Sequence, residues 1–229
     1  MAKKAAIVQS NYIPWKGYFD LIASVDEFIL FDDMQYTKRD WRNRNKIKTP
    51  RGPAWLTIPV ESKGKYLQKI RDTKVADPEW GKKHWRRIGD NYAKARFFKD
   101  YEEALAPLFF TGADYLSEIN RAFIATLCAL LGIRTRITDA GDYPPFEGKS
   151  TRLAELCLRA GADEYLSGPS ARDYLDESVF SERGIRVSYI DYSGYPEYRQ
   201  LFPPFDHRVS VLDLLFNEGP EARRFMKAS

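Results

Sequence analysis

Amide groups and aromatic rings are concentrated directly after the first predicted strand, residues 5–9. Gln9 and Asn11 carry amides, which read polar ligands and need partners wherever they are buried, and Tyr12 and Trp15 supply aromatic faces. In an open α/β sheet the loops at the carboxyl ends of the strands form the ligand crevice, and the N-terminus of a following helix favours an anion. We therefore predict that Gln9, Asn11, Tyr12 and Trp15 bind substrate; the alternative is that Tyr12 and Trp15 pack into the core.

Charged and amide side chains follow the second predicted strand, residues 27–32, over a longer segment. A carboxylate such as Asp33 can orient an amine or a hydroxyl, or hold Mg²⁺, whereas Lys38 and Arg44 are residue types that recognise phosphate. The alternative is a solvated charged hairpin, which we expect for Arg39, Arg42, Lys46 and Arg51. Among the other residues of the segment, we predict catalytic roles for Asp33, Lys38, Asn43 and Arg44 and substrate binding by Gln35 and Trp41.

Two serines follow a third predicted strand, residues 164–167, in the sequence YLSGPSARDYL. Ser167 and Ser170 can present hydroxyls to an anion, and we predict that they bind substrate; a helix cap next to a Gly-Pro turn explains Ser170 equally well. The sequence GKST at 148–151 ends as a phosphate-binding Walker A loop does, but Tyr143 stands where that motif requires a glycine. We therefore interpret GKST as a helix cap.

Histidines and cysteines are few and far apart in the chain. His84, in the basic segment KKHWRR, is interpreted as a surface or packing residue, and His207, just before a predicted helix, is a minor catalytic candidate. Cys128 and Cys157 have apolar neighbours, as reduced cysteines in the core of a cytosolic protein do. Because no metal-ligand spacing is present, we predict no metal site.

The composition, with 44% hydrophobic and 30% charged residues, is that of an ordinary soluble globular protein. The first residues lack the apolar region of a secretory signal, and no apolar run approaches the ~18 residues of a membrane span. We therefore expect a cytoplasmic protein without a membrane partner. The formal net charge is only +4, and acids and bases are mixed outside KRDWRNRNKIKTPR and KKHWRR. This pattern favours an anionic small molecule over generic nucleic-acid binding.

Apolar periodicity and chain breakers predict the remaining elements. Strands are expected near 5–9, 27–32, 54–60, 135–138, 164–167 and 186–191, and helices near 18–25, 79–95, 99–109, 113–131, 150–160, 178–183, 209–217 and 220–228. The alternation of strands and helices predicts an α/β fold, a mainly parallel Rossmann-like sheet with helices on both faces. We expect one domain over residues 1–229, in which the mostly helical stretch 77–131 is either an inserted lid or one face of that domain.

Five segments carry a family resemblance. QSNYIPWKGYFDLI, DDMQYTKRDWRNRNKIK, WLTIPV, YLSGPSARDYL and VSVLDLLFNEG occur in this order between Ile7 and Gly219. Together they resemble the WbqC-like protein family, whose members occur in bacterial O-antigen and other surface-polysaccharide gene clusters and have been suggested to be glycine transferases. Ser10 stands where members usually have proline. The resemblance supplies no catalytic residues, so the site prediction depends on the three loops.

The resemblance implies a transferase of surface-polysaccharide (O-antigen) biosynthesis that forms an amide. Glycine or a related acyl group would be added to a nucleotide-linked amino sugar, after activation by ATP with Mg²⁺, as a thioester or on aminoacyl-tRNA. The partners would then be the nucleotide-linked amino sugar and the amino acid or its activated form. The alternatives are a non-catalytic protein that binds RNA or another polyanion through WRNRNKIK and aromatic stacking, and an assembly factor.

Overall fold

The central sheet has five strands, all parallel, and the computed structural model describes residues 2–228. In spatial order the strands are β5 (Arg136–Asp139), β2 (Glu27–Leu30), β1 (Lys4–Val8), β6 (Glu164–Ser167) and β7 (Arg186–Tyr189). β1 is the central strand, with Ala5 opposite Glu27 of β2 and opposite Tyr165 of β6. The predicted α/β fold with a parallel Rossmann-like sheet is confirmed.

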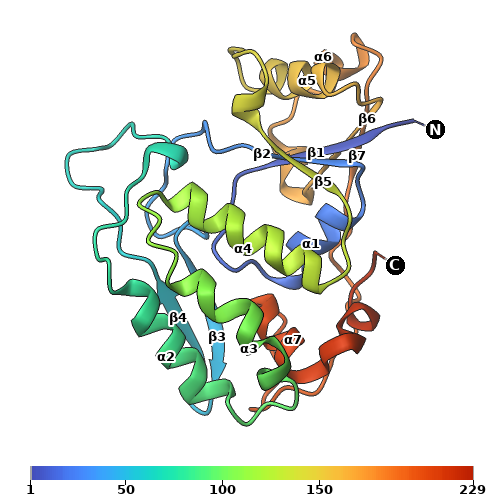
Figure 1. Cartoon of the computed structure of the whole chain (residues 1–229). Coiled ribbons are helices and arrows are strands. Elements are labelled where there is room, and N and C mark those ends of the chain that lie inside the picture. Colours follow the sequence, from blue (N-terminus) through green and yellow to red (C-terminus); the bar gives the residue numbers. More distant parts are fainter. Residues whose placement is uncertain (1, 229) are drawn as a thin grey trace.

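Two apolar cores lie on opposite faces of this sheet because successive side chains of a strand point to opposite sides. Ala5 and Ile7 of β1 belong to the core under α5 (Ser150–Arg159) and α6 (Ser178–Ser181). Ala6 belongs to the larger core under α1 (Lys16–Ala23) and α4 (Leu116–Leu130). Figure 1 shows the two pairs of helices on the two sides of the sheet. Strands buried on both faces have continuous apolar sequences, and this is why AAIV of β1 and FIL of β2 can be recognised as strands.

The strand order reverses at β1. From β1 the chain moves outward through β2 to β5, and it then crosses back to place β6 and β7 on the other side of β1. The connections that leave the carboxyl ends of β1 and β6 therefore diverge to opposite faces. In sheets of this type the ligand crevice lies at such a reversal.

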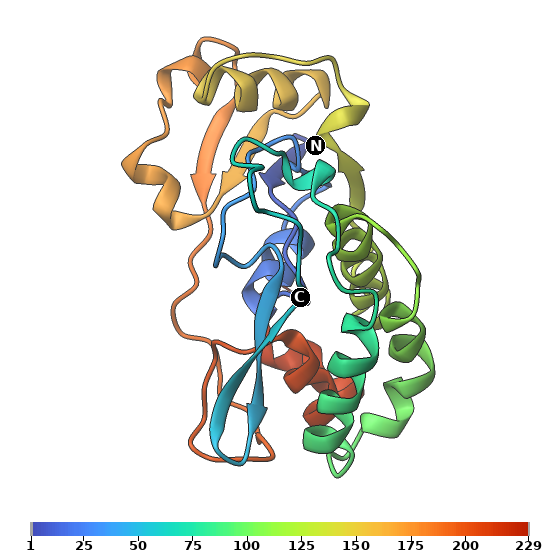
Figure 2. The same cartoon turned by 90° about the vertical axis from the view of Figure 1, so that its left-hand side faces the viewer.

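A two-stranded antiparallel hairpin, β3 (Arg44–Thr49) and β4 (Gly52–Thr57), extends away from the sheet. It packs with α2 (Trp80–Tyr92), α3 (Phe98–Leu105) and α7 (Val211–Glu218), whose buried residues belong to the larger core. Figure 2 shows the segment after β7 running beside this hairpin, where the Ser210 N–H donates to the Lys46 carbonyl at 2.8 Å. The helices of the stretch 77–131 thus share one core with α1 and β1.

Three elements differ most from prediction. Residues 44–49, expected in a charged loop, form β3, in which Asn45 and Ile47 point inward and Lys46 between them lies on the outer face, whereas Lys48 is buried. The strand predicted at 54–60 begins at Gly52 and ends at Thr57. The α-helix predicted at 220–228 is a 3₁₀-helix, Gly219–Phe225, in which Gly219 has a φ of +55° and Pro220 lacks an N–H to donate.

Candidate functional site

A cleft of about 700 Å³ opens at the carboxyl ends of β1 and β6, where the strand order reverses. Its walls come from the loops after β1, β2 and β6, the first turn of α5, and the segment after β7. Five of the residues predicted to bind substrate line it: Gln9, Asn11, Trp15, Ser167 and Ser170. The sheet therefore brings the first and third predicted loops to one place.

One wall of the cleft is positively charged. Lys149, at the N-cap of α5, is exposed and makes no capping hydrogen bond through its side chain, and Arg152 lies one turn further along the helix. The Ser150 hydroxyl accepts the Asp176 N–H at 2.9 Å, which fixes the start of α5 to the loop before α6. The N–H groups of a first helical turn lack intrahelical partners and favour an anion. Two cations and a helix terminus therefore face the same space.

The other walls of the cleft carry aromatic rings. Tyr174 is 70% exposed, and Tyr192 lies edge-on to Trp15 with ring centroids 5.2 Å apart. The Ser167 hydroxyl donates to the Tyr165 hydroxyl at 3.2 Å, whereas Ser170 is exposed. Exposed aromatic faces beside hydroxyls and cations are suited to a ligand that carries a ring and a phosphate.

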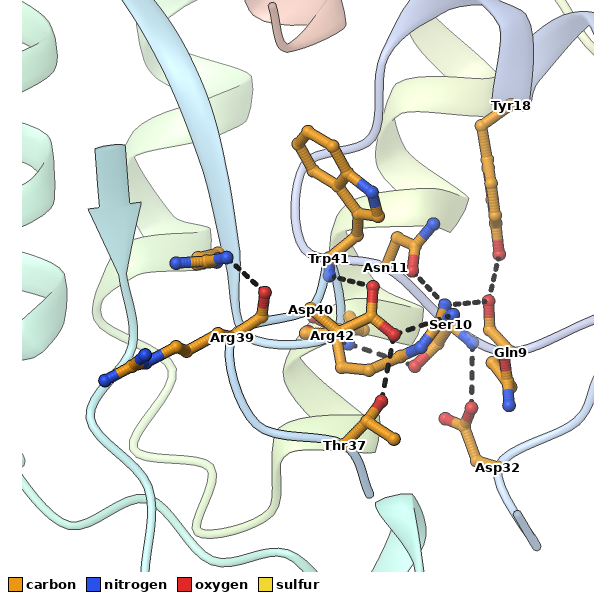
Figure 3. Close-up of polar contacts among 12 residues, drawn as sticks. Gln9, Ser10, Asn11, Tyr18, Asp32, Thr37, Arg39, Asp40, Trp41 and Arg42 are labelled. Atoms are coloured by element: carbon orange, nitrogen blue, oxygen red, sulfur yellow. Dashed lines mark hydrogen bonds and ion pairs between the residues drawn. The ribbon is translucent and has the colours of Figure 1, made fainter. Parts of the chain in front are cut away.

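Arg42 holds the first loop in place through hydrogen bonds. Its guanidinium donates to the Asn11 side-chain oxygen and, at 3.5 Å, to the Gln9 carbonyl, and the Tyr18 hydroxyl donates to the same carbonyl at 3.1 Å (Figure 3). The Ser10 N–H donates to the buried Asp32 carboxylate at 2.8 Å. We expected Arg42 to be solvated, but its side chain is only 12% exposed, because the two loops fold over it. It is a positioning residue that the charge pattern did not reveal.

Substitution of Arg42 by lysine is expected to lower the free energy of unfolding by about 1–3 kcal/mol, since an ammonium cannot bridge Asn11 and the Gln9 carbonyl as the planar guanidinium does. Urea unfolding followed by circular dichroism measures the loss. Arg39→Lys is the matched control, because Arg39 is exposed in the same loop. Equal losses in the two variants would contradict the bridging role.

The second predicted loop contributes Met34 to the cleft wall, but its predicted site residues reach the cleft only indirectly or not at all. Asp33 forms ion pairs with Arg71 and with Arg152, the latter at 2.9 Å, so its carboxylate holds a cleft residue in place. Gln35 and Lys38 lie instead beside Tyr66: the Gln35 amide donates to the Tyr66 carbonyl at 2.6 Å, and the Lys38 ammonium is 5.7 Å from the ring centroid. Neither of these two side chains lines the cleft.

Three other predicted residues lie in or on the hairpin region. The Asn43 amide is buried and donates to the Ile58 carbonyl at 2.8 Å, which joins the chain before β3 to the chain after β4. The Arg44 guanidinium lies 4.2 Å from the centroid of Trp55, and Trp41 packs on the same indole at 5.3 Å. Trp41 borders a smaller pocket next to the cleft.

Tyr12 belongs to the larger core. It is fully buried, and its hydroxyl is 2.9 Å from His84 Nδ1. His84 Nε2 is 3.1 Å from the Thr57 carbonyl, so the ring donates there and accepts from Tyr12. Burial lowers the pKa of His84 to about 4, which keeps the imidazole neutral near pH 7. His84 is therefore a packing residue that links the first loop to β4.

The structure adds cleft residues that the sequence reasoning missed, namely Lys149, Arg152, Tyr174 and Tyr192. The GKST segment was the feature of the sequence that could have indicated the two cations. Its interpretation as a helix cap is wrong for these side chains: Lys149 makes no capping hydrogen bond, and the Ser150 hydroxyl accepts from the loop before α6. Tyr174 belongs to the segment YLSGPSARDYL, so its place after the third strand was a signal, whereas Tyr192 had none, because its relation to the first loop depends on the crossing from β5 to β6.

The two cysteines and His207 are buried or half-buried in the fold. Burial raises the pKa of Cys128 and of Cys157 to about 12, so both thiols are protonated near pH 7. His207 is half-buried with its ring 4.5 Å from that of Phe205, and burial lowers its pKa. Within residues 2–228 no three histidine, cysteine or acidic side chains are grouped so as to hold a metal ion. None of the helices in that range is long and apolar enough to cross a membrane.

Fold and cleft together define an α/β protein with its ligand crevice at the strand-order reversal of a parallel sheet. Comparison with known sequences gives the family: the chain belongs to the WbqC-like protein family, whose model matches residues 9–225. It is 54% identical over 226 residues to the uncharacterized protein Rv1507c of Mycobacterium tuberculosis (strain ATCC 25618 / H37Rv), covering 98% of each chain. No solved structure matches the chain significantly.

Proposed function

We propose that the protein is a transferase that holds a nucleotide-linked amino sugar in the cleft and adds glycine or a related acyl group to its amine, in the synthesis of a surface polysaccharide. The observation that carries the proposal is the convergence of Lys149, Arg152 and the N-terminus of α5 on a cleft with exposed aromatic walls. Such a site is complementary to a diphosphate joined to rings. The identity of the acyl group, glycine, is taken from the activity suggested for the family.

The dimensions and chemistry of the cleft suit such a ligand. Its volume of about 700 Å³ lies within the range of about 300–1,000 Å³ of small-molecule sites. Lys149, Arg152 and the helix N–H groups would hold the diphosphate, and Tyr174 and Tyr192 offer faces on which a base can stack. Ser167 and Ser170 can bond ribose or sugar hydroxyls.

The transfer itself needs an activated acyl donor. The amine nitrogen of the sugar attacks the carbonyl carbon of the donor, a C–N bond forms, and the bond from that carbon to the leaving group breaks. The leaving group, a phosphate, a thiolate or the hydroxyl of a tRNA, departs with the electron pair, and the amine loses a proton to solvent. In this proposal Asp33 positions Arg152 through their 2.9 Å ion pair.

Lys149→Ala is expected to weaken binding of UDP-glucosamine at least tenfold, because a charge-assisted hydrogen bond to phosphate is worth about 1.5–3 kcal/mol and about 1.4 kcal/mol is a factor of ten. Isothermal titration calorimetry measures the affinity, after a thermal-shift panel with UDP-glucosamine, UDP-glucose, ATP with Mg²⁺, glycine and short RNA. A ligand at a hundred times its Kd stabilises the protein by about 2.7 kcal/mol, which the panel detects.

Lys94→Ala is the matched control, since Lys94 is exposed and lies just after α2, outside the cleft. Equal affinities in the two variants would contradict the proposed site. If RNA alone stabilises the protein, with an affinity that falls steeply as salt rises, the polyanion-binding alternative replaces the transferase. The outer face of the hairpin, where Arg44 and Lys46 lie over Trp55, is the surface that this alternative would use.

A further inference from the structure

A second, smaller hollow of about 180 Å³ adjoins the cleft. Its walls are Asn11, Pro14, Trp15, Trp41, Asn45 and Arg208. Asn11 and Trp15 also line the cleft, so the two spaces share a wall. At this volume the hollow is below the range of about 300–1,000 Å³ that holds a complete ligand. It is therefore the size of a subsite for one part of a ligand that extends into the cleft.

Two aromatic rings, Trp15 and Trp41, line this small hollow. Trp15 lies edge-on to Tyr192 and Tyr195, at 5.2 and 5.8 Å between ring centroids. Trp41 contacts Trp55 on its other side, at 5.3 Å between ring centroids, and remains 40% exposed. An indole face is a flat apolar surface against which the C–H face of a sugar ring packs.

Few polar groups of the hollow are free for a ligand. The Asn45 amide is fully used: its nitrogen donates to the Tyr12 and Ile13 carbonyls at 3.2 and 2.9 Å, and its oxygen accepts the Lys46 N–H at 2.8 Å. The Asn11 oxygen accepts from Arg42, which leaves the Asn11 amide nitrogen as a donor (Figure 3).

A cation stands at the rim of the hollow. The Arg208 side chain is 81% exposed, and its guanidinium lies 3.5 Å from the Asp206 carboxylate, a loose pair that leaves donors for a ligand. Aromatic faces with one amide donor and one guanidinium suit a ring that carries hydroxyls, which accept from both groups.

We propose that this hollow binds the sugar ring of a nucleotide sugar while the cleft holds its nucleotide. This inference rests on the proposed function and adds where the two parts of the ligand lie. The shared wall of Asn11 and Trp15 then stands at the junction between diphosphate and sugar. Trp41 can distinguish the sugar subsite from the nucleotide subsite, because it is an aromatic residue that borders the smaller hollow and not the cleft.

The test compares Trp41→Ala with Trp55→Ala. The two indoles touch and have similar exposure, 40% and 37%, but Trp55 does not line the hollow. Affinities of the folded variants for UDP-glucosamine and for UDP are measured by calorimetry, with melting curves to verify folding. Trp41→Ala is expected to weaken the affinity for UDP-glucosamine at least tenfold and to leave the affinity for UDP within twofold. Trp55→Ala is expected to leave both affinities within twofold.

Other results overturn the inference and distinguish it from the proposed function. If Trp41→Ala leaves the affinity for UDP-glucosamine unchanged while Lys149→Ala weakens the affinity for UDP, the sugar lies elsewhere and the proposed function stands. If both tryptophan variants weaken UDP-glucosamine alike, the outer hairpin face and not the hollow binds the ring. If neither probe binds and a short single-stranded RNA does, with losses in both tryptophan variants, the proposed function and this inference both fail.

Discussion

Phe123→Ala is expected to lower the free energy of unfolding by about 3–5 kcal/mol, the usual cost of deleting a fully buried phenylalanine ring. Phe123 on α4 is completely buried and packs edge-on against Tyr12 and Phe109, with ring centroids 5.5 and 4.9 Å away. Because Tyr12 adjoins Asn11, the resulting cavity also removes support from the first loop of the cleft. Urea unfolding measures the stability loss.

Phe110→Ala provides the matched control for this substitution. Phe110 is 58% exposed, so loss of its ring leaves no cavity, and the change is expected to stay within about 0.5 kcal/mol. A loss at Phe110 comparable to that at Phe123 would contradict the claim that burial in the larger core sets the cost of removing the ring.

Acidification from pH 7 to pH 4 is expected to destabilise the protein through His84 by about 3 kcal/mol, at about 1.4 kcal/mol for each pH unit between the two pKa values. Burial lowers the folded-state pKa to about 4, from 6.5 in an ordinary histidine. The unfolded chain therefore binds the proton first as the pH falls. This contribution to stability is fully present above pH 6.5 and is lost as the pH falls towards 4.

Urea unfolding of the natural protein and of His84→Gln at several pH values isolates this effect. The variant loses the Tyr12 and Thr57 contacts at every pH, so it begins less stable. The difference between the two proteins is then expected to shrink by about 3 kcal/mol between pH 7 and pH 4, because only the natural protein carries the imidazole. A constant difference would mean that His84 is not held neutral by burial.

The main elements could be predicted because they carry local signals. AAIV and the FIL of β2 are continuous apolar runs, as strands of a buried parallel sheet are, and α4 shows helical apolar spacing. β3 could not be recognised in the same way, because its sequence RNKIKT has one apolar side chain and owes its pairing to β4. Its inward Asn45 donates hydrogen bonds to two carbonyls of the first loop, and such a tertiary contact leaves no pattern in the local sequence.

The candidate site was predictable only in part for a related reason. Loops that follow strands could be found directly, and Gln9, Asn11, Trp15, Ser167 and Ser170 do line the cleft. The second loop is rich in similar residue types, but Asn43 is buried to join chain segments and Lys38 points to Tyr66. Residue types indicate which side chains are able to bind a ligand, whereas the fold decides which of them face the cleft.

The position of β6 beside β1 has a consequence for synthesis on the ribosome. β1 gains its first neighbour early, since Ala5 pairs with Glu27, but its other edge pairs with Tyr165 of β6. Until β6 has been made, that edge of the central strand is an open template of N–H and C=O groups, which invites pairing with other chains. The cleft likewise does not exist until then, because the loop after β6 forms one of its walls. A nascent chain stalled before residue 164 would therefore be prone to aggregation and unable to bind its ligand.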